Sequence, residues 1–165
     1  MHCLAENKKV VIVGIPGVGK TTIVSKVLEM LKEKKISASV SIFGTIMFEE
    51  AKKKGIKNRD ELRKLSVPEQ KELQSMAARK IASITDDVVI VDTHAFISTK
   101  EGFYPGLPHN VLEILTPDIF IMITARPEEI YNRRMKDATR DRDIVSIDAI
   151  KKELDVTSAM LSTCS

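Results

Sequence analysis

The stretch that decides the fold is KVVIVGIPGVGKT, residues 9–21. Its first five residues form a β-branched apolar run, which predicts a buried strand. The next eight, from Gly14 to Thr21, match the pattern G-x-x-x-x-G-K-[ST] at every fixed position. After them, apolar side chains repeat at helical spacing to about Lys34, which predicts an amphipathic helix. A strand, a glycine-rich turn and a helix in this order indicate a phosphate-binding loop.

The chemistry of such a loop comes from its backbone N–H groups and one lysine. Glycines let the backbone wrap around phosphate oxygens, and the helix N-terminus adds partial positive charge. We expect Lys20 to bridge the β- and γ-phosphates of a nucleotide, which makes it a catalytic candidate as well. Thr21 is expected to ligate Mg²⁺, and Thr22 to reach the α-phosphate. The candidate nucleotide-binding residues are Gly14, Ile15, Pro16, Gly17, Val18, Gly19, Lys20, Thr21 and Thr22.

A carboxylate follows a later apolar run, which ends at Val91. Asp92 comes directly after this predicted strand, the place from which an aspartate holds the Mg²⁺ shell in nucleotide-binding enzymes of this kind. We therefore expect Thr21 and Asp92 to be the metal ligands. Thr93 and His94 come next and are candidates for substrate contact, and a structural role fits this histidine equally well.

Arginines alternate with aspartates between residues 133 and 143. A phosphoryl-transfer transition state spreads negative charge over its equatorial oxygens, and arginine side chains stabilise that charge. Arg140 and Arg142 lie two residues apart in a predicted loop and are catalytic candidates, as is Arg134. The alternative, a ladder of ion pairs on the surface, applies most easily to Arg133.

Candidate substrate residues lie after the second predicted strand. Phe43, Gly44 and Thr45 offer an aromatic wall, a close backbone approach and a hydroxyl group, which suit a nucleotide pocket. Further along, Arg59 and Arg63 are either ligands for the phosphate of an acceptor nucleotide or partners in ion pairs on a helix surface.

The remaining sequence alternates predicted strands with predicted helices. The strands are solid apolar runs, typical of a parallel sheet covered by helices on both faces. With no repeat, low-complexity segment or linker, the prediction is a single α/β domain with three layers over residues 1–165. We predict strands at 9–13, 38–43, 88–91 and 119–124, and helices at 20–34, 46–54, 109–115, 127–136 and 146–162.

Local signals predict the start of two helices and the position of one loop. Gly44 and Thr45 are expected to break the second strand and to cap the helix that follows. Ser66 and Glu69 form the pattern of a capping box, which predicts the start of another helix. Residues 98–108 are rich in glycine and proline and are expected to form a loop.

Composition narrows the class of protein. The chain has 165 residues, 43% of them hydrophobic, enough for one self-supporting core, and no apolar run approaches the ~20 residues of a membrane helix. Its net charge of +3, with 4% aromatic residues and no tryptophan, argues against a nucleic-acid partner. Two cysteines without metal spacing and no signal-like N-terminus predict a reduced, cytoplasmic protein.

Two classes of P-loop protein fit poorly. The guanine-binding Asn-Lys-x-Asp of GTPases is missing, and Phe43-Gly44-Thr45 stands where a shikimate-type kinase carries acidic ligands. Six segments indicate the family. The segments are GIPGVGKTT (14–22), FGT (43–45), NRDELRKLS (58–66), VDTHA (91–95), GFYPGLP (102–108) and ATRDRD (138–143). In this order they resemble the archaeal type of adenylate kinase, a P-loop nucleoside monophosphate kinase, over nearly the whole chain.

The resemblance implies reversible phosphoryl transfer from Mg-ATP to AMP, giving two ADP, in a homotrimer. It implies a parallel sheet that in the family has the order 2-3-1-4-5, of which this sequence predicts 2-3-1-4 with the fifth strand absent. It also implies an AMP-binding helical insertion near 44–66 and a short lid near 137–145. Bacterial and eukaryotic relatives carry AMP-binding arginines that this sequence lacks, so Arg59 and Arg63 are the substitutes. The alternatives are a P-loop kinase for another monophosphate or small metabolite, and an ATP-dependent regulatory or RNA-assembly module.

Overall fold

The computed structural model describes residues 7–99, 102–136 and 146–164. The predicted lid at 137–145, with Arg140 and Arg142, lies outside the described residues. Among the described residues, no helix combines the length and the apolar character needed to cross a membrane.

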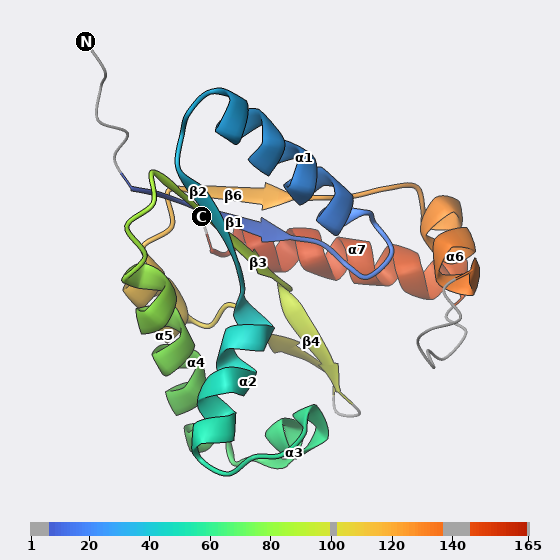
Figure 1. Ribbon diagram of the computed structural model, residues 1–165. Helices are drawn as coiled ribbons and strands as arrows, with labels where there is room; N and C mark the ends of the chain where they lie inside the picture. Colours follow the sequence, from blue (N-terminus) through green and yellow to red (C-terminus); the bar gives the residue numbers. More distant parts are fainter. Residues whose placement is uncertain (1–6, 100–101, 137–145, 165) are drawn as a thin grey trace.

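A parallel sheet forms the centre of the molecule (Figure 1). It contains β1 (Lys8–Val13), β2 (Ala38–Ile42), β3 (Val88–Thr93) and β6 (Ile119–Met122), in the order β2-β3-β1-β6. Since β6 is the fourth of these strands along the chain, the predicted order 2-3-1-4 is confirmed. Parallel strands end at the same edge, so the segments after β1, β2 and β3 meet there.

Helices cover both faces of the sheet (Figure 1). On one face, α1 (Lys20–Glu33) packs through Val24 against the even-numbered residues of β1. On the other face, α4 (Val67–Ala82), α5 (His109–Leu115) and α7 (Ile147–Ser162) pack against the odd-numbered residues of β1 and β3. Strand side chains alternate between faces, so a run such as VVIV supplies both halves of the core.

Two helices extend beyond the carboxyl edge of the sheet (Figure 1). They are α2 (Phe43–Lys53) and α3 (Arg59–Lys64), and we call residues 43–64 the helical arm. Asn58 caps α3 by accepting a hydrogen bond from the backbone N–H of Glu61. The capping box predicted before α4 is confirmed, because the Ser66 side chain and the Glu69 side chain each bind the other residue's backbone N–H.

The predicted start of α2 was wrong. Gly44 and Thr45 do not cap the helix but lie in its first turn, and the N-cap residue, Ile42, offers no side-chain hydrogen bond. The reason is packing: Phe43 is only 4% exposed and belongs to the main core, so the helix begins directly at the end of β2.

The loop expected at 98–108 is a second correction. The structure contains an antiparallel hairpin there, formed by β4 (Phe96–Thr99) and β5 (Gly102–Pro105). The Phe96 and Phe103 rings meet edge to face, 4.7 Å between centroids. Cross-strand contacts of this kind stabilise a hairpin even where glycine and proline weaken its local propensity.

The last helices match the sequence closely. Pro127 begins α6 (Pro127–Lys136), as expected for a proline at the first helical position. Ser146 caps α7 by accepting a hydrogen bond from the backbone N–H of Ala149. Ile130 of α6 and Ile150 of α7 are fully buried and form a small core with Ile15 and Val18, so these helices lie beside the phosphate-binding loop.

Candidate active site

The loop between β1 and α1 requires glycine at defined positions. Gly17 and Gly19 both have a φ of 93°, a left-handed conformation that side chains disfavour. A Cβ at Gly14 would lie 2.9 Å from the backbone oxygen of Ile123, so only glycine lets the loop pass the end of β6 this closely. The glycines of the motif are therefore required by the backbone conformation and by the close packing of the loop.

Lys20 lies at the centre of the carboxyl edge. Its Nζ is 2.6 Å from Asp92 Oδ1 and donates a hydrogen bond of 2.8 Å to the backbone oxygen of Thr93. The lysine and aspartate side chains are 11% and 16% exposed. The surrounding protein strengthens their attraction relative to a surface pair.

The sheet explains why residues so far apart in sequence meet. Asp92 is paired with Ile12 of β1 and Ile42 of β2, which places it between the two strands. Thr93 is buried, whereas His94, one residue later, is exposed. The structure thus brings the predicted residues Lys20, Asp92 and Thr93 together, while Thr21 and Thr22 are exposed in the first turn of α1.

These groups match the chemistry of a magnesium site. Mg²⁺ prefers oxygen ligands and usually takes one or two carboxylates from the protein, with phosphates and water completing its shell. Asp92 offers a carboxylate beside Lys20, and Thr21, the next residue of α1, offers an exposed hydroxyl. Among the described residues, no group of three or more His, Cys, Asp or Glu side chains forms a dedicated metal cage. The oxygen donors of Asp92 and Thr21 fit a magnesium ion whose other ligands are phosphate and water.

Two arginines of α6 hold the outer side of the loop. Arg133 Nη1 donates hydrogen bonds to the backbone oxygens of Val18 and Gly17, at 3.0 and 3.2 Å. Arg134 Nε donates to the backbone oxygen of Pro16 at 2.9 Å, and its Nη2 donates to Glu153 Oε2 at 2.7 Å. The contacts of Arg134 are therefore with the loop backbone and α7, and its predicted catalytic role stays a prediction.

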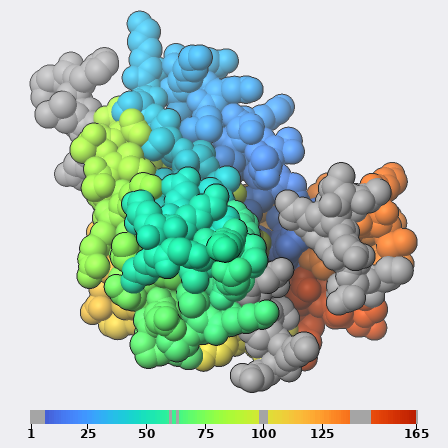
Figure 2. Space-filling model, turned by 60° about the horizontal axis from the view of Figure 1, so that its bottom comes forward, coloured from blue at the N-terminus to red at the C-terminus, as the bar shows by residue number. Residues whose placement is uncertain are grey.

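The helical arm faces the loop across the edge of the sheet. Figure 2 shows the surface hollowed between the arm, in teal and green, and the blue segment that contains the phosphate-binding loop. Gly44 and Thr45 lie in the first turn of the arm, and Arg59 Nη2 donates a hydrogen bond to Thr45 Oγ1 at 3.1 Å. The structure thus pairs two of the predicted substrate residues, while Phe43 is packed in the core. The side chain of Arg63 is not among those described.

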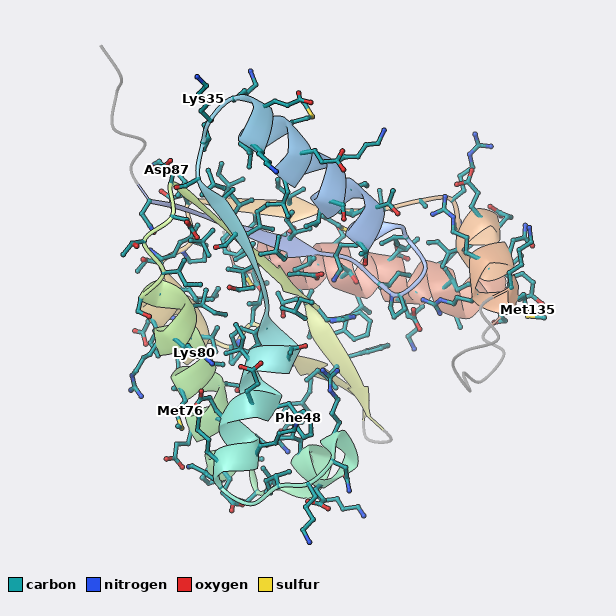
Figure 3. All side chains as sticks on the ribbon, viewed as in Figure 1. Lys35, Phe48, Met76, Lys80, Asp87 and Met135 are labelled. Atoms are coloured by element: carbon teal, nitrogen blue, oxygen red, sulfur yellow. The ribbon has the colours of Figure 1, made fainter. Side chains whose placement is uncertain are left out.

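Phe48 is a residue that the sequence analysis did not single out. It lies on the side of α2 that faces α3 (Figure 3), and the Arg59 guanidinium lies 5.7 Å from the centre of its ring. The Lys52 ammonium lies 4.7 Å from the same ring. Aromatic rings attract cations through their electron-rich faces. Phe48 and Arg59 belong to different helices, and helical periodicity relates only residues of the same helix. The sequence therefore carries no signal that pairs them.

Comparison with known proteins agrees with this geometry. A family model described as an AAA domain matches residues 13–151. The adenylate kinase of Methanocaldococcus jannaschii is 48% identical over 151 residues, covering 90% of this chain and 79% of that protein. The adenylate kinase of Pyrococcus horikoshii is 44% identical over 156 residues, covering 93% and 78%. The chain belongs to the adenylate kinase family.

Membership in the adenylate kinase family makes the protein a phosphotransferase, as the sequence predicted. Solved structures agree on the fold. The shikimate kinases of Bacteroides thetaiotaomicron and Acinetobacter baumannii superpose with TM-scores of 0.60 and 0.59 at 16% and 15% identity. They cover 94% and 98% of this chain, and this chain covers 82% of each of them. At this identity they support the P-loop kinase architecture alone.

Proposed function

We propose that this protein transfers the terminal phosphoryl group of ATP to AMP, reversibly, giving two ADP. The observation that carries the proposal is the Lys20–Asp92 pair, 2.6 Å apart and largely buried beside a glycine loop of the required shape. The similarity to archaeal adenylate kinases, at 42–48% identity, supports the choice of AMP as the acceptor.

Lys20 is the group that moves with the transferred charge. The ammonium is held at the mouth of the loop by Asp92 and the Thr93 carbonyl, and it has three protons to donate. ATP phosphates in the loop would give it stronger acceptors, supported by loop N–H groups and the start of α1. A cation that follows the charge from donor to acceptor stabilises the transition state more than the bound substrate.

Thr21 and Asp92 are proposed as the protein ligands of Mg²⁺. When bound, the ion would neutralise part of the phosphate charge. Asp92 then has two tasks, because the same carboxylate holds Lys20. Its position between β1 and β2 keeps it rigid for both.

The acceptor AMP is proposed to lie between the loop and the helical arm. Thr45 and Arg59 are already hydrogen-bonded to each other, so the guanidinium is oriented before a phosphate arrives. Gly44 is exposed and leaves room for close approach of a ligand. Arg63, Thr93 and His94 complete the proposed set of acceptor residues, and Phe43, packed in the core, anchors Gly44 and Thr45 beside them.

The catalytic arginines are proposed to be Arg140 and Arg142, with Arg134 acting through its contacts to the loop. A cytoplasmic homotrimer is proposed for the assembly. Ile119 and Ile121, 48% and 38% exposed on the edge strand β6, support association because an apolar sheet edge favours contact with another chain.

The test is a coupled assay for ADP formed from Mg-ATP and each of several acceptors. We expect AMP to give tens of turnovers per second, within the usual enzyme range of roughly 1–10³ s⁻¹, and CMP, UMP, GMP and shikimate to give far less. Preference for another acceptor would replace AMP in the proposal. Slow ATP hydrolysis with no acceptor dependence would favour a regulatory module instead.

A further inference from the structure

The contact between Arg134 and the loop has a direct consequence for the loop's N–H groups. In a trans peptide the carbonyl and the following N–H point in opposite directions in one plane. A donor that holds the Pro16 carbonyl therefore fixes the direction of the Gly17 N–H. Arg134 supplies this donor from outside the loop, at 2.9 Å. Gly17, with no side chain and a φ of 93°, otherwise leaves this plane free to turn.

Arg134 is itself held by α7. Its Nη2 lies 2.7 Å from Glu153 Oε2, and the two side chains are 10% and 22% exposed. The contrast is with Arg133, which is 49% exposed and lies 3.6 Å from Glu129 on its own helix. A pair that is short, charged and mostly withdrawn from water orients its partners more firmly than an exposed one.

Packing and hydrogen bonding of neighbouring residues hold the part of α7 that carries Glu153. It lies one turn after Ile150, which is fully buried against Ile15 and Val18 of the loop. One turn later Thr157, 1% exposed, donates a hydrogen bond from Oγ1 to the Glu153 backbone oxygen at 2.7 Å. The carboxylate is thus attached to a helix segment that packs directly beneath the loop. Figure 1 shows this segment of α7 beside α6 and the loop.

We propose that Glu153 is a positioning residue for the ATP phosphates. It holds the Arg134 guanidinium against the Pro16 carbonyl, and this contact keeps the Gly17 N–H directed into the loop. The carboxylate also offsets the guanidinium charge, so Arg134 remains at the backbone instead of turning toward a bound phosphate. The inference rests on the proposed function in one respect, that the loop binds the phosphates of ATP.

The first test measures nucleotide binding without chemistry. Calorimetry with the non-hydrolysable analogue AMP-PNP and Mg²⁺ is expected to give a Kd about tenfold higher for Glu153→Gln than for the wild type, below the ~10²-fold loss that a 1 Å displacement can cause. Glu153→Asp keeps the charge on a shorter side chain and should lie between them, at about threefold. Asp155→Asn removes an exposed carboxylate from the same helix and is the matched control, expected to leave Kd unchanged.

The second test separates positioning from general stability. In the ATP–AMP assay, Glu153→Gln should raise KM for ATP about tenfold and leave KM for AMP within about twofold, because the acceptor site lies on the helical arm. The effect should also depend on Arg134: once Arg134→Gln has removed the contact, adding Glu153→Gln should change the AMP-PNP Kd no further.

Several results would overturn the proposal. They are an unchanged Kd in Glu153→Gln, equal rises in both KM values, or additive effects in the double variant. If Glu153→Gln does not fold, Glu153→Asp decides by the same criteria. A wild type that binds AMP-PNP but does not phosphorylate AMP refutes the proposed function, while the binding measurements still judge the role of Glu153.

Discussion

The phosphate-binding loop and the helical arm lie at the same edge of the sheet and are held in different ways. The loop is built from one contiguous motif, and its central pair, Lys20 and Asp92, is at most 16% exposed. The arm contributes Phe43 and Ala51 to the core, and its charged side chains form mostly exposed ion pairs, such as Lys54 with Glu72 of α4, whose side chains are 42% and 58% exposed. Surface pairs contribute little to stability. We therefore expect substitutions in the loop to cost much more than substitutions among the arm's charged side chains.

The largest effect is expected at Lys20. Lys20→Met keeps the length of the side chain and removes its charge, so turnover should fall at least ~10²-fold, as for the loss of one preorganised donor. Asp92 should then lose its partner, and the melting temperature should fall while the fold persists. A steady-state assay with circular dichroism as the control for folding measures both. Turnover close to the wild type in a folded variant would refute the role of the loop.

A substitution in the arm is expected to change KM for AMP and not KM for ATP. Arg59→Ala removes the guanidinium next to Thr45, and KM for AMP should rise roughly tenfold, since a charge-assisted hydrogen bond contributes about 1.5–3 kcal/mol. KM for ATP should stay the same. The control, Lys54→Gln, removes an exposed charge from the same arm and should change neither value. A matching rise in Lys54→Gln would show that the general charge of the arm binds AMP, and Arg59 has no special part.

Replacing one glycine in the loop and one in the arm by alanine adds the same methyl group to both regions and compares their packing. Gly17→Ala meets Ile130 Cγ2 at 3.2 Å in a left-handed conformation, so the free energy of unfolding should fall by about 1–2 kcal/mol. Gly44→Ala lies in the first turn of α2 with no atom within 4 Å, so the free energy should rise by up to ~1 kcal/mol. Urea denaturation measures both changes. Equal destabilisation by the two substitutions would contradict the contrast between a tightly packed loop and an open arm.

The smallest effect concerns the buried carboxylate of the arm. Hydrogen bonding from Lys53, with further help from Lys80, lowers the pKa of Glu50 below its usual 4.5. A lowered pKa means that the charged form stabilises the fold above pH 4.5 and that this contribution is lost as the pH falls through the pKa of the folded state. The melting temperature of Glu50→Gln should therefore lie below the wild type at pH 7, and the two should converge in acid. A constant difference from pH 7 to pH 3 would argue against this pairing.

The features that could be predicted from the sequence follow the same division between loop and arm. The loop could be predicted because its conformation depends on glycines and a lysine that are close together in the chain, and the capping box at Ser66 because it uses neighbours three residues apart. The order of the sheet followed from the alternation of strands and helices together with the family resemblance. The predicted roles of Arg140, Arg142 and the other site residues stay predictions.

Errors arose where distant packing overrides local preference. Gly44 and Thr45 read as a cap, but burial of Phe43 starts the helix at the end of β2. The GFYP segment read as a loop, but pairing with β4 makes it a strand. At Gly106 a Cβ would collide with the His94 backbone oxygen, so this glycine allows a close approach of two chain segments that composition alone does not reveal.

The sequence by itself determined the phosphate-binding loop, the alternation of strands and helices and the family, because each depends on backbone preferences or on residues near one another in the chain. Only the tertiary structure decided which groups hold the loop and the arm. Arg134 reaches Pro16 and Glu153, and Arg59 reaches Thr45, through folding that brings separate helices together. Such contacts exist only once the core has packed, since the burial of apolar side chains, and not the local sequence, sets where each helix lies.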